Sequence, residues 1–163
     1  IVIIDEAYVE FGGESALPLL EKYENLLVVQ TLSKSYSMAG MRIGYAFGSP
    51  QLIRAMNDVK YSCNSYTMNR AALYYGAAAI RDVSYHREML ERIIKTRLDS
   101  KTNFLFATHS RLPAEEIYEK LREKNIYVRY FKKPFIDDYI RITIGTEEEM
   151  KALITNLAIL TNH

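Results

Sequence analysis

The sequence has few cysteines, no excess charge of either sign and no long apolar run. Cys63 is the single cysteine, so it can form no internal disulfide and has no thiol companions for a zinc site. The 21 basic and 20 acidic side chains leave a net charge of +1, which argues against a nucleic-acid or anionic-membrane partner. Apolar runs such as residues 1–4 are far shorter than the roughly 20 residues of a membrane span. We therefore expect a soluble protein of a reducing compartment, the cytoplasm.

The motifs and residue spacings of the sequence also do not indicate a metal site or a nucleotide-binding site. No glycine-rich phosphate loop of the Walker or dinucleotide type occurs. The spacing of His86, His109 and His163 fits no metal site, and we expect all three at the surface. Cys63 is expected to be an inert buried thiol.

Apolar residues make up 48% of the 163 positions, enough for a packed core in one domain or two small lobes. Residues 1–4, 26–29 and 43–47 are short apolar segments separated by turns, which predicts part of an α/β sheet. Residues 1–4 form a continuous β-branched run, typical of a parallel strand that is covered on both faces and has neighbours. Because nothing precedes them and the chain does not open on Met, we expect a truncated chain.

The second half of the chain predicts an α+β arrangement. Residues 67–98 have helical periodicity, as one long helix or as two with a break near Arg81 and Asp82. Thr146 and Glu149 form a capping-box pair for a final helix. The other expected elements are a helix at 50–59, a strand at 103–107 and a helix that opens at Pro113.

Two arginines fall on alternating strand patterns. Arg141 lies in Tyr-Ile-Arg-Ile-Thr-Ile (139–144), and Arg129 lies in Tyr-Val-Arg-Tyr-Phe (127–131). If the strands form a hairpin centred on Phe135, Arg129 is directly opposite Arg141. Facing like charges are destabilising unless an anion binds between them. The alternatives are two solvated arginines or a different register.

Residues 31–45 combine cations and hydroxyls with small residues. Ser33, Lys34 and Arg42 lie there among residues that allow close backbone approach. Such a segment can hold a phosphate, and its lysine can serve as an amine nucleophile for a carbonyl. Taken alone, a Ser-Lys pair is more often a solvent-exposed pair without a binding or catalytic role.

A carboxylate follows the first apolar run. Asp5 stands at the carboxyl end of that strand, the edge where open α/β sheets bind ligands, and Tyr8 comes three residues later. Asp5 could hold a protonated heterocyclic nitrogen, and Tyr8 a neighbouring oxygen. The alternative is an aspartate that caps the next turn and a core tyrosine.

Together these segments resemble the fold-type-I pyridoxal-phosphate enzymes, most closely the histidinol-phosphate aminotransferases. The resemblance runs in order through essentially the whole chain. The matching segments are Ile4-Asp5-Glu6-Ala7-Tyr8, Thr31-Leu32-Ser33-Lys34-Ser35 with Arg42 eight residues after the lysine, Val128-Arg129, and Ile140-Arg141-Ile142-Thr143-Ile144-Gly145-Thr146.

The resemblance implies a role for each matching cofactor-binding residue. Lys34 would condense with the aldehyde of pyridoxal 5'-phosphate and shuttle the proton of the reaction. Asp5 would keep the ring nitrogen protonated, and Tyr8 would hydrogen-bond the phenolic oxygen. Ser33 and Arg42 would hold the cofactor phosphate.

The resemblance also implies the substrates. Arg141 would bind a carboxylate of glutamate or 2-oxoglutarate as a bidentate pair, and Arg129 the substrate phosphate or the second carboxylate. The implied reaction is transamination between histidinol phosphate and 2-oxoglutarate, in histidine biosynthesis, by a homodimer.

The resemblance further implies that residues 1–61 are the C-terminal part of the large domain and residues 62–163 a smaller α+β domain. A preceding segment of similar size would complete the cofactor site. We therefore predict that this chain alone binds cofactor poorly and is inactive; visible cofactor absorbance at stoichiometric loading would contradict this.

Other functions fit the same residues. The nearest is a phosphothreonine decarboxylase of cobalamin synthesis, followed by another fold-type-I aminotransferase such as one for aromatic amino acids. An alternative of a different class is a non-catalytic α/β phosphate-binding or interaction module in which Lys34 is an ordinary surface amine.

Overall fold

A computed structural model describes residues 1–96 and 100–161, and the chain divides into two compact units between Glu91 and Arg92. The division lies later than the boundary expected after residue 61 and falls inside helix α3 (Val83–Thr96). Helix α2 (Arg70–Arg81) belongs to the first unit because its Ala72 packs in that unit's core. The assignment of residues 1–61 and 62–163 to a large and a small domain stays a prediction.

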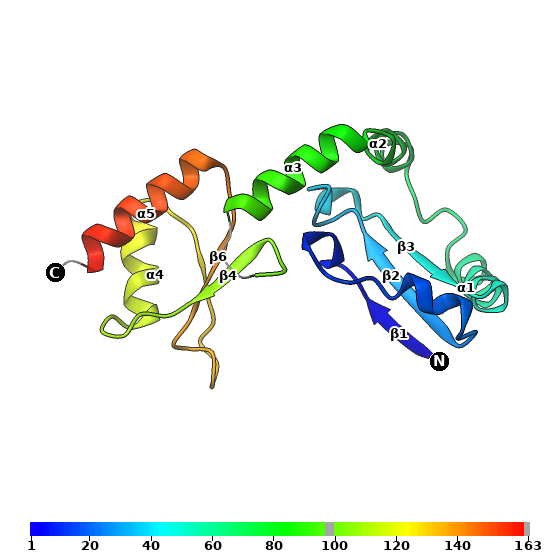
Figure 1. Cartoon of the computed structure of the whole chain (residues 1–163), viewed down its shortest axis with the longest axis horizontal. Coiled ribbons are helices and arrows are strands. Elements are labelled where there is room, and N and C mark those ends of the chain that lie inside the picture. The colour runs from blue at the N-terminus through cyan, green and yellow to red at the C-terminus, as the bar shows by residue number, and fades with distance from the viewer. Residues whose placement is uncertain (97–99, 162–163) are drawn as a thin grey trace. The chain divides into compact units, whose positions relative to one another are not determined.

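The first unit contains a three-stranded sheet in the order β1-β2-β3 (Figure 1). Strand β1 (Val2–Asp5) runs parallel to β2 (Leu26–Thr31), and β3 (Gly44–Gly48) runs antiparallel to β2. Central β2 begins with three buried apolar residues, since side chains of a central strand are flanked on both sides by those of its neighbours. The α/β class and the three strands predicted from the sequence are confirmed.

Strand β1 is less covered than its composition indicates. Val2 and Ile3 are 52% and 64% exposed, whereas a continuous β-branched run predicted burial on both faces. The reason is that β1 pairs with β2 alone among the described residues, so its other edge has no strand beside it there. Burial follows from neighbours, and composition alone cannot supply them.

The helices of the first unit begin at residues whose side chains cap them. Helix α1 (Pro50–Cys63) starts after Ser49, whose hydroxyl accepts the Leu52 N–H at 3.4 Å. The predicted helical segment 67–98 is two helices, α2 and α3, and its residues 97 and 98 lie outside the described residues. They break at Asp82, whose Oδ1 accepts the Tyr85 N–H at 3.2 Å.

Helix α2 approaches the sheet closely at a glycine. A Cβ on Gly76 would lie 2.7 Å from the Cδ1 atom of Ile43, closer than carbon atoms can pack. Ile43 and fully buried Leu32 form a small core with Ala72 of the same helix. Glycine and alanine therefore let α2 cover the segment between β2 and β3, which contains the lysine of interest.

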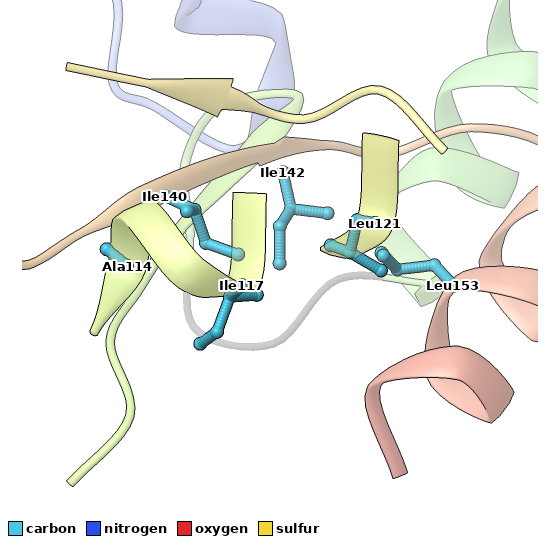
Figure 2. Close-up of a cluster of buried hydrophobic side chains, with 6 residues drawn as sticks. All are labelled: Ala114, Ile117, Leu121, Ile140, Ile142 and Leu153. Atoms are coloured by element: carbon cyan, nitrogen blue, oxygen red, sulfur yellow. The ribbon is translucent and has the colours of Figure 1, made fainter. Parts of the chain in front are cut away.

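The second unit packs two helices on an antiparallel sheet of order β4-β6-β5. Its elements are β4 (Phe104–Ala107), α4 (Ala114–Glu123), β5 (Arg129–Tyr130), β6 (Ile140–Thr143) and α5 (Glu147–Thr161). Figure 2 shows the buried core between them, formed by Ala114, Ile117, Leu121, Ile140, Ile142 and Leu153.

The predicted capping box of α5 is confirmed. The Thr146 N–H donates to Glu149 Oε2 at 2.8 Å, and the Glu149 N–H donates to the Thr146 hydroxyl at 3.3 Å. In the described part of the chain, no helix is both long enough and apolar enough to cross a membrane.

Candidate functional site

Five of the predicted site residues lie around one edge of the first unit's sheet. Parallel strands β1 and β2 end at this edge, and antiparallel β3 begins there. Asp5 is the last residue of β1, and the loop after β2 contains the lysine. The residues gathered at this edge are Asp5, Tyr8, Ser33, Lys34 and Arg42. Ligands of open α/β sheets bind at the carboxyl ends of the strands, so this edge is the candidate site.

The side chains of Lys34 and Tyr8 lie together. Lys34 Nζ is 5.2 Å from the centroid of the Tyr8 ring, which is a cation–π distance. Within the described residues, the Lys34 amine has no carboxylate partner, and the side chain is half-buried. An amine held by a ring and not by an anion is available to a carbonyl compound.

The sequence left two roles open for Asp5, a cap of the next turn and a partner for a cationic nitrogen. Its Oδ1 accepts the Ala7 N–H at 3.0 Å, which confirms that the side chain caps the following turn. Its Oδ2 accepts no hydrogen bond from the described part of the chain, and the residue is exposed. The carboxylate can therefore cap the turn and still bind a cationic group with its second oxygen.

Ser33 and Arg42 lie just beyond the end of the β2–β3 pairing, one on each of the two chain segments. The Leu32 N–H donates to the Ile43 carbonyl at 3.1 Å, and each predicted residue is one step beyond this pair. The Ser33 Oγ accepts the Thr31 hydroxyl at 2.8 Å. Arg42 has a left-handed backbone with φ 56°, and its exposed guanidinium donates to the Ala39 carbonyl at 3.1 Å. The two segments thus bring a hydroxyl-bearing residue and an arginine to the same end of the sheet, and both residue types can bind an oxyanion.

The predicted facing of the two arginines is confirmed. Strands β5 and β6 pair with Arg129 opposite Arg141, the register of a hairpin centred on Phe135. The guanidinium carbon of Arg129 is 5.4 Å from the Phe131 ring centroid, and that of Arg141 is 5.9 Å from it. Arg141 also lies 5.2 Å from the Phe104 ring centroid. The aromatic rings hold two like charges on one face of the sheet.

Arg141 is the more buried of these two arginines. Its Nε is buried and has no hydrogen-bond partner in the described residues, whereas Arg129 is exposed. Neither guanidinium forms an ion pair with a carboxylate in that part of the chain. A planar cation with an unpaired buried donor can bind a carboxylate or phosphate that supplies the missing acceptor. Both arginines belong to the second unit, so we describe them as a site of their own.

Some expectations for single residues were wrong. His86 was expected at the surface, but its side chain is 12% exposed because its ring stacks on Tyr36. His109 is partly exposed, which does not contradict the expected surface position, and its Nδ1 accepts the Leu112 N–H at 3.1 Å. Cys63 was expected to be buried but is exposed, because it ends α1 on a side that no described element covers. His163 lies outside the described residues.

The sequence indicated no role for Glu6, which is a buried anion next to the site. Its side chain accepts hydrogen bonds from the Ser15 hydroxyl and the Gln30 amide, both at 2.8 Å, and from the Ala16 N–H. Burial raises the pKa of the Glu6 carboxyl, but these hydrogen bonds outweigh it, so the pKa lies below its ordinary value. Glu6 thereby ties the segment after β1 to β2.

We expect Glu6 to make the stability of the chain fall in acid. Because its folded pKa is lowered, its contribution is present above the ordinary pKa of 4.5 and is lost as the pH falls through the folded value. Glu6→Gln should destabilise the fold by about 1–3 kcal/mol at pH 7, because an amide NH₂ then faces a donor. In this variant the free energy of unfolding should also depend less on pH below pH 4.5. Urea unfolding at several pH values measures both, and exposed Glu14→Gln is the matched control. An equal acid slope in the two variants would contradict this assignment.

A cavity of about 590 Å³ in the second unit lies apart from the predicted residues. Neither Arg129 nor Arg141 lines it. Its walls come from α5, β6 and the segment after α4, and include Tyr127, Ile142 and Met150. We assign this cavity no part in the candidate site.

Comparison with known proteins gives consistent matches. The family model described as aminotransferase class I and II matches residues 1–157. Histidinol-phosphate aminotransferase of Brachyspira hyodysenteriae is 48% identical over 172 aligned positions, which cover 96% of this chain and 49% of that protein. The chain thus spans about half the length of the curated relatives it matches.

Solved structures match the chain in the same way. Histidinol-phosphate aminotransferase from Sinorhizobium meliloti, in complex with pyridoxal-5'-phosphate, matches with a TM-score of 0.81 and 27% identity, over 95% of this chain and 47% of that one. L-threonine-O-3-phosphate decarboxylase from Porphyromonas gingivalis matches with a TM-score of 0.72 and 21% identity, over 99% of this chain and 55% of that one. The second likeness shows the fold alone.

Proposed function

Because this chain belongs to the aminotransferase class I and II family, we propose that the complete protein carrying it transfers an amino group between histidinol phosphate and 2-oxoglutarate. The observation that carries the proposal is the amine of Lys34, which lies over the Tyr8 ring at the sheet edge where Asp5 ends β1. The name of the 48% identical relative supports this choice of substrates.

The residues at this edge suit pyridoxal phosphate by their chemistry. Its aldehyde requires a primary amine without a carboxylate partner, as Lys34 provides. Its ring nitrogen requires a carboxylate with a free oxygen, as Asp5 provides. Its phosphate requires hydroxyl and cationic donors, and Ser33 and Arg42 lie at the same end of the sheet, one residue beyond the Leu32–Ile43 hydrogen bond. When bound, the cofactor supplies an aldehyde for the amino group and a ring that accepts electrons.

The chain's own residues then perform the remaining steps. With the cofactor present, Lys34 Nζ would hold its aldehyde carbon and, once freed by the substrate amine, would take up the proton of the substrate carbon as a general base. Asp5 Oδ2 would keep the proton on the ring nitrogen. The Tyr8 hydroxyl would donate to the cofactor's phenolic oxygen, and the Tyr8 ring lies 5.2 Å from Lys34 Nζ.

The paired arginines are proposed to bind the anionic ends of the two substrates. Arg141, with its buried unpaired Nε, takes a carboxylate of glutamate or 2-oxoglutarate. Arg129 takes the phosphate of histidinol phosphate, or the second carboxylate when glutamate binds. An anion between them removes the repulsion of two facing cations.

A transamination assay tests the proposal. In the complete protein, histidinol phosphate with 2-oxoglutarate should yield glutamate, and borohydride should fix pyridoxal phosphate on Lys34. Release of carbon dioxide from phosphothreonine, without amino transfer, would instead support the decarboxylase. Amino transfer confined to aromatic amino acids would support the other aminotransferase, and absence of label on Lys34 the binding module.

We propose a homodimer in the complete protein, as the family resemblance implies, and a cytoplasmic location, as befits amino-acid biosynthesis. Size-exclusion chromatography with light scattering measures the first directly.

A further inference from the structure

Four side chains in and beside the Lys34 loop (residues 32–38) have no part in the proposed chemistry. We call Glu10, Ser35, Tyr36 and His86 the Glu10 cluster. The Ser35 hydroxyl donates a hydrogen bond to Glu10 Oε2, and His86 Nε2 lies 3.7 Å from Glu10 Oε1. Glu10 belongs to the short 3₁₀ helix Val9–Phe11, and His86 to α3. One carboxylate therefore contacts two other segments of the first unit.

Within the cluster Ser35 and His86 are shielded from water, whereas the Glu10 side chain is 32% exposed. Ser35 is 4% exposed, and the His86 ring stacks on Tyr36 with 3.8 Å between centroids and 3° between planes. Burial raises the pKa of the Tyr36 hydroxyl, and the negative charge of Glu10 raises it further. A hydrogen bond to a carboxylate is stronger in such surroundings than at an exposed surface.

The Lys34 loop is anchored on both sides of the lysine. On one side Leu32 is fully buried, and its carbonyl accepts the Met38 N–H at 3.0 Å. On the other side Ser35 binds Glu10. Between these anchors the Lys34 carbonyl accepts the Ser37 N–H at 3.1 Å, which closes a tight turn. The Ser35 anchor is the polar one, so one substitution can remove it.

Glu10 is also attached to the segment that contains Tyr8. The neighbouring Phe11 is fully buried, and its N–H donates to the Tyr8 carbonyl at 3.1 Å. The Tyr8 ring in turn lies against Lys34 Nζ. The hydrogen bond from Ser35 to Glu10 thus joins the segment that contains Tyr8 to the loop that contains Lys34.

We propose that Glu10 is a positioning residue, which through Ser35 holds the Lys34 loop against the Tyr8 segment and keeps the amine over the Tyr8 ring. This inference rests on the proposed function, in which that amine receives the cofactor aldehyde. Glu10 acts through Ser35 and is assigned no contact with substrate or cofactor. Small displacements of a reacting group slow a reaction strongly, so a fixed loop increases the rate of capture.

The experiment measures the loop and the amine separately in the complete protein. Hydrogen–deuterium exchange of residues 32–38 in the cofactor-free protein reports the loop. The rate at which added pyridoxal phosphate becomes fixed on Lys34 by borohydride reports the amine. The variants are Glu10→Ala, Glu10→Gln, Ser35→Ala and the double Ala variant, with exposed Glu14→Ala as the control.

We expect Glu10→Ala and Ser35→Ala each to slow capture about tenfold and to speed exchange of the loop. The double variant should lose no more than either single one, because both remove the same hydrogen bond. Glu10→Gln should retain a rate within about threefold, since its amide oxygen still accepts the Ser35 hydroxyl. Additive losses, or Ala variants that behave like Glu14→Ala, would overturn the proposal.

Should circular dichroism show that Glu10→Ala does not fold, Ser35→Ala decides alone, and unchanged exchange and capture in it overturn the inference. If the unsubstituted protein takes no label on Lys34, the proposed function fails. The exchange measurement requires no cofactor, so it still tests whether Glu10 holds the loop.

Discussion

Replacing Lys34 with alanine should abolish borohydride-stable binding of pyridoxal phosphate and slow amino transfer by at least about a thousandfold. The reason is that the proposed chemistry assigns two acts to one atom, since Nζ both binds the aldehyde and moves the proton. Absorbance of the loaded complete protein and the rate of glutamate formation measure the two losses.

Two further variants make the Lys34 result specific. Lys34→Arg retains a cation that can lie over the Tyr8 ring, but a guanidinium stays protonated and does not condense with aldehydes, so it should be as inactive as alanine. Lys60 offers a matched control, because its Nζ lies 4.9 Å from the Tyr61 ring on α1, away from the sheet edge. Lys60→Ala should retain full activity. An active Lys34→Arg variant would show that charge matters and the amine does not.

Replacing Arg141 with alanine should lower kcat/KM for glutamate by about a hundredfold or more, mainly through KM. A bidentate, charge-assisted pair contributes about 3 kcal/mol, and alanine leaves the carboxylate unpaired. Arg141→Lys keeps the charge but loses the planar fork, so it should recover only part of the loss. Initial rates over a range of glutamate concentrations measure these effects.

The control for Arg141 is an arginine of the same unit with a partner of its own. Exposed Arg122 lies 3.5 Å from Glu119, and Arg122→Ala should leave KM for glutamate unchanged. Arg141→Ala should also spare amine donors that lack a carboxylate. Equal losses with both kinds of donor would mean that Arg141 supports the sheet and does not bind the substrate.

Much of the fold was predictable because its signals are local. The capping box at Thr146 and the helix break at Asp82 depend on side chains that bond their own neighbours in sequence. The facing of Arg129 and Arg141 was predictable as well, because alternation and loop position together restrict a hairpin to few registers.

The Glu10 cluster could not be predicted in this way. Its carboxylate, hydroxyl and imidazole come from three separate segments, and no spacing in the sequence marks them as neighbours. For Glu6, strand alternation is the feature of the sequence that bears on its burial. Successive strand residues point to opposite faces, so beside an exposed Asp5 the next carboxylate points toward the interior and requires donors there.

Residue order by itself determined the strands and helix starts and placed Asp5 and Lys34 at or just after the ends of strands. The parallel pairing of β1 with β2, which brings both to one sheet edge, belongs to the tertiary structure. Only the tertiary structure decided which of these side chains are buried or in contact with other groups, and which groups those are. It buried Glu6 and His86, exposed Cys63 and Val2, and laid the amine of Lys34 over Tyr8. The physical reason is that burial and hydrogen bonding depend on every segment that packs against a residue, whereas local conformation depends mainly on its neighbours in the chain.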